Sequence, residues 1–345
     1  MDVVLEIVDT YIGDYIYAWA HPAHPTSYEF LNNNSNSTEL FSSSWQYKTA
    51  NPYFEVTPSK YAYMSAWDRD NVYRQAISLY LITWIFGFLL YFIFATLSYV
   101  FVFDKNTKNH PKYLKDQMRL EILQTNKSMP GMALLTTPCF LAEVRGYTKL
   151  YSTPADGPGL WYEILQYPIF IVFTDALIYL IHRGLHHPSV YKYLHKPHHK
   201  WIMPTPYASH AFHPVDGFAQ SLPYHIFPLL FPLNKFASVF LFIFVNFWTI
   251  MIHDGEYVAD SPVINGAACH TMHHLYFNYN YGQYTTFWDR LGNSYRKPDA
   301  NLFQKEQKMS EAQWKKQVEE TEKMVKEVEG VDDRSYDPHE SKKKN

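Results

Sequence analysis

The stretch ISLYLITWIFGFLLYFIFATLSYVFVF, residues 77–103, contains no charged residue. A helix of about 20 apolar residues crosses the hydrocarbon core of a bilayer, so this stretch is long enough to cross it at a tilt. A helix that is apolar on every side over such a length is unusual in a soluble protein. The stretch therefore predicts a helical membrane protein.

Two later apolar regions and one shorter stretch extend this prediction. Residues 129–144 form a shorter, proline-interrupted stretch that returns across the membrane, and residues 162–181 then cross it again. Residues 222–252 are interrupted near Pro228 and Pro232, which favours a helical hairpin that enters and leaves on the same side. We expect an all-α, polytopic membrane protein with about four to five transmembrane or hairpin helices and a cytosolic, histidine-rich, metal-binding helical cap.

The composition of the whole chain fits this class. The 345 residues have a mean hydropathy of −0.29, because polar ends are averaged with an apolar middle. A formal net charge of −3 gives no indication of nucleic-acid binding. Cys139 and Cys269 form no Cys-x-x-Cys unit and no disulfide framework, and Cys269, beside His270, is interpreted as a packing residue.

The regions before and after the first span set its orientation. Residues 22–70 are polar and loop-rich, with glycosylation sequons at Asn33 and Asn36. Residues 104–127 carry more basic side chains than the 20 residues before the span. Because cytosolic flanks are enriched in Lys and Arg, we expect a luminal N-terminus and a cytosolic segment after the span. The first residues, MDVVLEIVDTYIGDY, lack the cationic start of a signal peptide and indicate a surface helix.

These features divide the chain into three parts. We expect a luminal or interfacial region at 1–76, a membrane domain with the histidine clusters at 77–300, and a charged cytosolic tail at 301–345. Within the tail, residues 303–330 alternate in charge and predict an exposed helix. The final residues Lys342–Asn345 resemble a dilysine retrieval signal, which indicates a multi-pass protein of the endoplasmic reticulum membrane.

Histidines gather in three short clusters that begin at His182, His195 and His270, with the sequences HRGLH, HKPHH and HTMHH. Their eight imidazoles are too many for one tetrahedral zinc ion and suit two metal ions. Positions i, i+3 and i+4 share one helix face, so each cluster can aim its rings at one point. Imidazole binds zinc, copper, iron and nickel alike, so the spacing leaves the metal open. Iron would activate O2 against a C–H bond, whereas zinc would activate water for hydrolysis.

The clusters resemble those of the membrane fatty-acid-hydroxylase and sterol-desaturase superfamily. Within it, HKPHHKW (195–201), SHAFHPVDG (209–217), MIHDGEY (251–257) and CHTMHHLYFNYNYGQYTTFWDRLG (269–292) are similar to fungal C-5 sterol desaturases. The similarity extends over residues 77–300, and MDVVLEIVD and YVFVFDK (99–105) match as well.

The resemblance implies an oxidoreductase that introduces the C5–C6 double bond into an episterol-like Δ7-sterol during ergosterol synthesis. It implies two iron ions, O2, and electrons from NADH or NADPH through cytochrome b5 and its reductase. The chain has no G-x-G-x-x-G motif and no haem-attachment motif of its own. Lys192, Lys196 and Lys200, with the basic residues of 104–127, would offer a cationic surface to an acidic donor.

The resemblance also implies a set of site residues. The expected metal ligands are His182, His186, His195, His198, His199, His270, His273 and His274, joined by His213 and His253 outside the clusters. His210 is a weaker candidate, and His187 and His225 are interpreted as packing or hydrogen-bonding residues. Acids that could accept from the second nitrogen of a ligand are Asp175, Asp216, Asp254 and Asp289.

Three alternatives stay open at this point. The nearest is another oxidase of the superfamily, either a sterol C4-methyl oxidase or a lipid hydroxylase. A zinc-dependent membrane hydrolase would act without oxygen. A metal-handling membrane protein would carry ligands within its spans, whereas these histidines lie at span ends.

Overall fold

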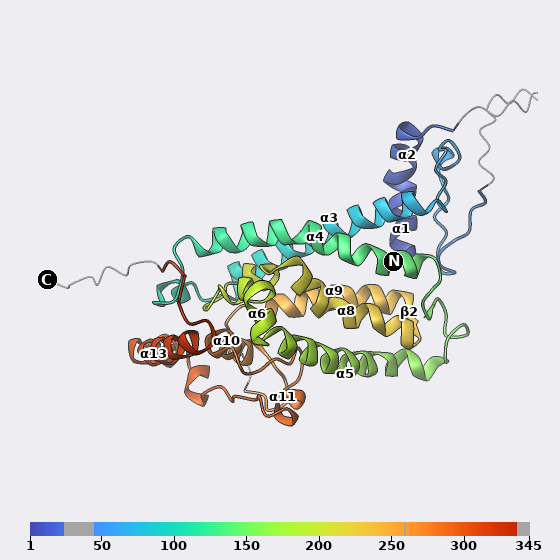
Figure 1. Ribbon diagram of the computed structural model, residues 1–345. Coiled ribbons are helices and arrows are strands. Elements are labelled where there is room, and N and C mark those ends of the chain that lie inside the picture. Colours follow the sequence, from blue (N-terminus) through green and yellow to red (C-terminus); the bar gives the residue numbers. More distant parts are fainter. Residues whose placement is uncertain (24–44, 259, 337–345) are drawn as a thin grey trace, which may run out of the picture.

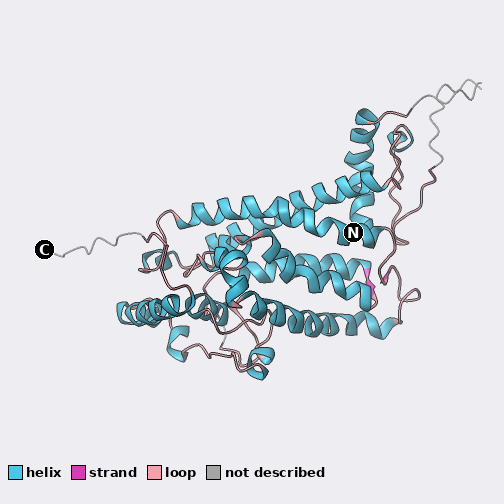
Figure 2. Cartoon of the chain, in the orientation of Figure 1, coloured by secondary structure: helices cyan, strands magenta, loops and turns pink. Residues whose placement is uncertain are grey.

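The computed structural model describes residues 1–23, 45–258 and 260–336. The glycosylation candidates Asn33 and Asn36 and the terminal Lys342–Asn345 lie outside these residues. The regular structure of the described part is helical apart from two short strands, and loops connect the helices (Figure 2).

Five long helices run side by side and form the body of the molecule (Figure 1). They are α3 (Val72–Phe101), α4 (Gln117–Val144), α5 (Leu160–Leu185), α8 (Pro214–Leu230) and α9 (Lys235–Ile252). Among the described residues, three helices, namely α3, α5 and α9, are long and apolar enough to cross a membrane. This confirms the expected all-α membrane fold. The expected return stretch at 129–144 is the second half of α4, which continues through Pro130 and Pro138.

Helices α8 and α9 form the expected hairpin. The turn between them contains β2 (Leu233–Asn234), which pairs in parallel with β1 (Leu150–Tyr151). The Asn234 side chain then accepts hydrogen bonds from the backbone N–H groups of Phe236 and Ala237 and so caps the start of α9. The hairpin places the C-terminal end of α9 beside the histidine clusters.

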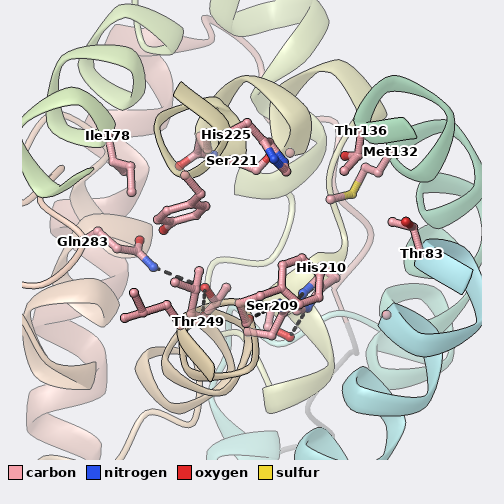
Figure 3. A pocket seen from close by; sticks show the side chains of 18 of the residues that line it. Thr83, Met132, Thr136, Ile178, Ser209, His210, Ser221, His225, Thr249 and Gln283 are labelled. Atoms are coloured by element: carbon pink, nitrogen blue, oxygen red, sulfur yellow. Dashed lines mark hydrogen bonds between the residues drawn. The ribbon is translucent and has the colours of Figure 1, made fainter. Parts of the chain in front are cut away.

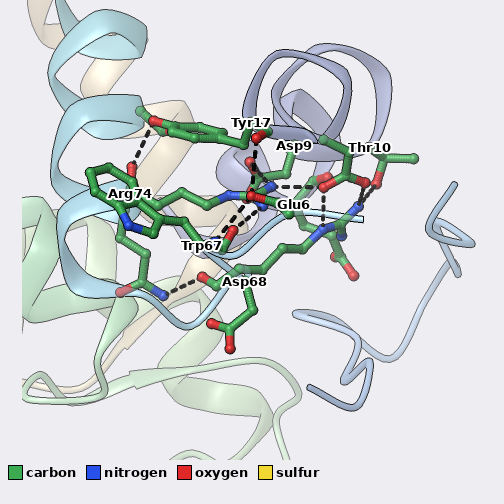
Figure 4. A network of polar contacts seen from close by, with 12 residues as sticks. Glu6, Asp9, Thr10, Tyr17, Trp67, Asp68 and Arg74 are labelled. Atoms are coloured by element: carbon green, nitrogen blue, oxygen red, sulfur yellow. Dashed lines mark hydrogen bonds and ion pairs between the residues drawn. The ribbon is translucent and has the colours of Figure 1, made fainter. Parts of the chain in front are cut away.

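One end of the bundle carries the N-terminal helices α1 (Asp2–Val8) and α2 (Asp14–Ala20), joined by the π-helical turn η1 (Asp9–Gly13) (Figure 1). A buried ion network attaches them to the start of α3 (Figure 4). The fully buried Arg74 guanidinium lies 2.8 Å from Asp9 and 2.7 Å from Asp14, and Arg69 lies 2.6 Å from Asp14. These pairs keep the buried carboxylates compensated. The short helix η2 (Lys60–Tyr63) lies at the same end.

The other end of the bundle carries a cap of mostly short helices, with the described C-terminal residues beside it (Figure 1). Before α10 the cap contains η3 (Lys105–Asn109), α6 (Pro188–Leu194), α7 (Lys196–His199) and η4 (Pro206–His210). It continues with α10 (Ala267–Tyr276), α11 (Phe287–Leu291), η5 (Ala300–Phe303), α12 (Lys305–Lys308) and α13 (Glu311–Val328). All three histidine clusters therefore lie at the end of the bundle far from α1 and α2.

Helix α13 differs from the exposed helix that the charge pattern predicts. Gln317, Thr321 and Val325 recur every four residues and are buried. Val325 packs in one apolar cluster with Met272 and Leu275 of α10. Trp314, Met324 and Val328 are partly buried along the same face, so the helix is amphipathic and only its other face is exposed. The C-terminal segment is thus part of the cap.

Candidate metal centre

Four elements bring histidines to one point beneath the cap. His182 lies one turn before the C-cap residue His186 at the end of α5, and His253 is the C-cap residue of α9. Helix α7 and the residue before it carry the second cluster, and α10 carries the third. Because two of these elements are the ends of bundle helices, the centre lies where the apolar bundle meets the cap.

The histidines form two adjoining groups that could each hold a metal ion. The first group is His182, His186, His195, His199 and His273, and the second is His198, His253, His270 and His274. Within each group the ligand atoms lie within 4.8 Å of one another. Every ring is buried, and even the most accessible, that of His186, is only 9% exposed.

The Nε2 atoms of these rings face one another. His182 Nε2 lies 3.1 Å from His195 Nε2 in the first group, and His253 Nε2 lies 2.9 Å from His270 Nε2 in the second. Nitrogens about 2.1 Å from a common metal and at right angles around it lie about 3 Å apart. The observed spacing therefore fits ligands of a shared ion.

Unpartnered nitrogens give the same indication. Among the described residues, both ring nitrogens of His186 are buried and have no hydrogen-bond partner. A buried polar atom without a partner costs about 1–3 kcal/mol, so such a ring is stable only if something else occupies its lone pair. A metal ion would do so, and the donor set is therefore a good fit for one.

The Nδ1 atoms of several rings face outward to fixed acceptors. His195 Nδ1 lies 2.8 Å from the carboxylate of Asp216. His182 Nδ1 lies 2.9 Å from the carbonyl oxygen of Tyr281, and His253 Nδ1 lies 2.6 Å from that of Thr249. A proton on Nδ1 leaves the Nε2 lone pair free for a metal and fixes the orientation of the ring.

Burial also sets the charge of the cap histidines. It lowers the pKa of His198, His199 and His274 well below that of an exposed imidazole, and neighbouring imidazoles lower it further. These rings are consequently neutral near pH 7, which is the form that binds a metal.

A cavity extends from the histidines into the bundle, and helices α3, α4, α5, α8 and α9 line it (Figure 3). His182, His198, His253 and His270 line one end. Most of the remaining wall is apolar, with scattered polar groups such as Thr83, Thr136, Ser221 and Gln283. An apolar cavity that ends on two all-histidine groups is suited to oxidation of a lipid held within the membrane.

Comparisons with known proteins agree with this arrangement. A sequence model of the fatty acid hydroxylase family matches residues 167–294. The chain is 64% identical over 343 residues to the probable Delta(7)-sterol 5(6)-desaturase of Neurospora crassa, with 99% of each chain covered. It is 60% identical to the Delta(7)-sterol 5(6)-desaturase of Leptosphaeria maculans, over 100% of this chain and 99% of the relative.

The chain belongs to the Delta(7)-sterol 5(6)-desaturase family. More distant members retain the similarity over the full length. The Delta(7)-sterol 5(6)-desaturase ERG3 of Candida albicans is 50% identical, with 97% of this chain and 99% of the relative covered. No solved structure matches.

The structure brings together all of the expected ligands except His213. That residue is only partly buried and is the N-cap of α8, where its Nδ1 accepts a hydrogen bond from the Val215 N–H. Its ring bonds the first turn of the helix and belongs to neither histidine group. His210 also lies outside both groups and bonds Ser209 and Asn246 beside the cavity.

The histidines that we interpreted as packing or hydrogen-bonding residues also lie outside both groups. His187 is the exposed N-cap of α6, and its side chain accepts from the Ser189 N–H. His225 is buried, and its ring lies edge-on to Phe140.

The four expected acids have different contacts. Asp216 alone among them touches a histidine of either group. Asp175 accepts from the backbone N–H groups of Gln283, Tyr284 and Thr285, so it holds a loop rather than a ring. Asp289 accepts from two further N–H groups of that loop, and Asp254 accepts from the Glu256 N–H.

Sequence reasoning missed the backbone acceptors of this loop, residues 279–285. The carbonyl oxygens of Tyr279 and Tyr281 hold His273 and His182, at 2.7 and 2.9 Å. No side-chain pattern encodes a carbonyl, but the long aromatic string after the third cluster marks the segment that supplies them.

Part of the expected cationic surface is paired with acidic side chains within the cap. Lys196 lies 3.3 Å from Glu329 and 3.0 Å from Asp333 of the C-terminal segment. Lys112 is buried and lies 3.0 Å from Glu322. Lys192 and Lys200 remain exposed. The charge pattern alone could not reveal these pairings, because their acidic partners lie more than 120 residues away.

Proposed function

We propose that this protein is a Δ7-sterol 5(6)-desaturase that introduces the C5–C6 double bond into a Δ7-sterol with two iron ions, as in ergosterol biosynthesis. The observation that carries the proposal is the pair of buried, all-histidine groups at the end of an apolar cavity within a membrane bundle. Full-length relatives that are 50–64% identical carry the name of this activity.

Each histidine group would hold one ion. His182, His186, His195, His199 and His273 would bind the first, and His198, His253, His270 and His274 the second. Iron bound there supplies the redox chemistry by which O2 is activated, which zinc does not support. The alternative hydrolase would need no such redox centre.

The proposed reaction is balanced as follows. The C5–H and C6–H bonds of the sterol break, and their electrons yield the C5=C6 π bond and two electrons for O2. A reduced donor supplies two further electrons, and two protons from the solvent join the two that are released from C5 and C6. The four electrons and four protons convert one O2 into two molecules of water. We propose NADH or NADPH, through cytochrome b5 and its reductase, as the source of the donor electrons.

The residues of the chain have separate tasks in this reaction. The apolar cavity wall holds the sterol and excludes water from the reacting carbons. Asp216 holds the proton on His195 Nδ1, and the Tyr281 and Thr249 carbonyls do the same for His182 and His253. The rings therefore stay oriented with their lone pairs turned inward throughout turnover.

We also propose that the protein spans the endoplasmic reticulum membrane several times, with the histidine centre and C-terminus in the cytosol. The centre and the N-terminal helices lie at opposite ends of the bundle, which supports opposite sides for the two (Figure 1). Glycosylation at Asn33 or Asn36 and protease cleavage of the Lys342–Asn345 tail in sealed microsomes test this orientation.

The decisive experiment is sterol analysis of cells that lack the protein, with and without its restoration. Accumulation of a Δ7-sterol that lacks the Δ5 bond, reversed on restoration, is expected. Purified protein should contain two irons, and microsomal conversion should require O2 and NADH. Turnover under strict anaerobiosis, or with zinc alone, would refute the oxidase and favour a hydrolase.

A further inference from the structure

The position of the proposed reaction limits where the sterol hydroxyl can lie. In a sterol, the oxygen on C3 is three bonds from C5. A sterol whose C5–C6 bond reaches the histidine end of the cavity therefore brings its hydroxyl close to that end as well. The group that binds the hydroxyl must consequently lie beside the metal ligands. This inference rests on the proposed function, since it concerns the same cavity.

Gln283 has the geometry that such a group needs. Its backbone N–H donates to Asp175 Oδ1 at 3.0 Å, and its Nε2 donates to Thr249 Oγ1 at 3.2 Å. These two bonds hold the residue at its backbone and at the end of its side chain. Within the described part of the chain, its Oε1 accepts no hydrogen bond, and Figure 3 shows the side chain at the cavity wall with this oxygen turned away from Thr249.

Gln283 also lies between ligands of both groups. Two residues before it, the Tyr281 carbonyl accepts from His182 Nδ1 at 2.9 Å. Its partner Thr249 accepts from His253 Nδ1, through the backbone carbonyl, at 2.6 Å. A hydroxyl bound at Gln283 would therefore be close to both groups, as the position of C5 and C6 requires.

Some other polar groups of the cavity are already occupied, whereas the Thr83 hydroxyl has no partner among the described residues but lies across the cavity from Gln283 (Figure 3). Asn246 Oδ1 lies 3.1 Å from His210 Nε2, and the Ser221 hydroxyl donates to the Phe218 carbonyl. Gln220 is the nearest rival, because it too lines the cavity and donates through Nε2, in its case to Asp216 at 2.8 Å. Its backbone is held within α8, so Gln220 is fixed in a comparable way and serves as the residue against which Gln283 is tested.

We propose that Gln283 Oε1 accepts a hydrogen bond from the 3-hydroxyl of the sterol and thereby places C5 and C6 against the histidine centre. Gln283 is then a specificity-determining residue for 3-hydroxysterols. A sterol without a donor at C3 leaves this oxygen unpaired, and a 3-ketone sets one acceptor against another.

The test compares a Δ7-sterol with its 3-deoxy analogue in the full-length protein. We would measure kcat/KM for both, and the Kd of both for metal-depleted protein in detergent. Wild type should prefer the hydroxylated sterol roughly tenfold, the effect of one buried hydrogen bond. Gln283→Met should remove this preference by weakening the hydroxylated sterol alone. The matched variant Gln220→Met should keep the preference, whatever its rate.

Several outcomes would overturn the inference. An equal loss for both sterols in Gln283→Met would mean a structural role only, and a lost preference in Gln220→Met would assign the hydroxyl to that residue. A further test uses the wild-type protein alone. The 3-keto analogue of the sterol should bind to it no more tightly than the 3-deoxy sterol does. If wild type converts neither sterol, the proposed function fails, yet the Kd values still decide the role of Gln283.

Discussion

The guanidinium of Arg334 donates a hydrogen bond of 2.8 Å to the backbone carbonyl of His199. His199 belongs to the second histidine cluster, whereas Arg334 follows α13 near the end of the described chain. Arg334 also forms a buried pair with Glu329, at 2.7 Å, and both side chains are 1% exposed. Glu329 in turn accepts from the Tyr191 hydroxyl at 2.9 Å. The C-terminal segment thus holds α6 and α7 in place.

Arg334→Met should destabilise the protein and loosen the metal centre. It leaves the Glu329 carboxylate buried with a less complete set of partners, and breaking a buried pair costs about 3–5 kcal/mol. We expect a lower melting temperature and less bound metal per chain. The double variant Arg334→Met/Glu329→Gln should recover part of the stability, because no buried charge is stranded.

Lys315→Met is the matched control for this prediction, because Lys315 is an exposed cation on α13. It should leave both the melting temperature and the metal content unchanged. Wild-type metal content in Arg334→Met would show that the contact with His199 has no bearing on the centre.

His186 and His213 should respond differently to substitution by alanine. The His186 ring lies in the first group with both nitrogens unpartnered, whereas His213 caps α8. His186→Ala should lower the metal content and abolish desaturation. His213→Ala should keep two metals and lose about 0.5–2 kcal/mol of stability, as a lost helix cap does. Element analysis of the purified variants separates the two, and metal loss in His213→Ala would place that ring at the centre after all.

Asp216→Asn should weaken metal binding without removing a ligand. The carboxylate lies 2.8 Å from His195 Nδ1, and the amide of Asn offers at best a neutral and weaker acceptor. Losing such an outer contact typically lowers metal affinity or activity about 10–100-fold. Competition with a chelator measures the affinity directly. Asp156→Asn, on an exposed turn at the other end of the bundle, is the matched control and should bind metal as wild type does.

The buried His210 should make stability depend on pH in a defined window. Burial lowers the pKa of His210 to about 4 from an ordinary value of 6.5. Below pH 6.5 the unfolded chain takes up a proton that the folded chain does not. The contribution of the neutral His210 ring to the stability of the fold is therefore complete above pH 6.5 and is lost as the pH falls toward 4.

Comparison with His210→Gln isolates this contribution, because the variant has no imidazole to protonate. We expect the difference in melting temperature between the metal-free proteins to be constant from pH 7 to 8. As the pH falls from 6.5 to 5, the melting temperature of wild type should fall more than that of the variant. A difference that stays constant down to pH 5 would show that His210 is not buried as a neutral ring.

Local sequence patterns were enough for the broad architecture. An uncharged stretch at 77–103 can satisfy its backbone polar groups in a membrane only as a helix, so α3 was predictable from composition alone. The hairpin at 222–252 was equally readable, because Pro and Asn interrupt an otherwise apolar run. The histidine clusters indicated a site with two metals because i, i+3 and i+4 spacing is a property of the helix itself.

Tertiary structure alone decided which histidines share an ion and which only resemble ligands. His198 and His199 are adjacent in sequence yet belong to different groups, because neighbouring residues on a helix point about 100° apart. His253 joins the second group and His213 joins neither, although both lie outside the clusters. Such a difference depends on where the end of each helix lies in the folded protein.

The contacts that hold the centre likewise could not be predicted from the sequence. The Tyr281 carbonyl on His182 and the Arg334 contact with His199 join residues 99 and 135 positions apart. A backbone carbonyl has no signature in a sequence, and a charged residue near the end of a chain is by default assigned to solvent. The sequence by itself determined the helices and the chemistry of their ends. Only long-range packing, which buries particular groups and leaves others exposed, decided how those ends meet.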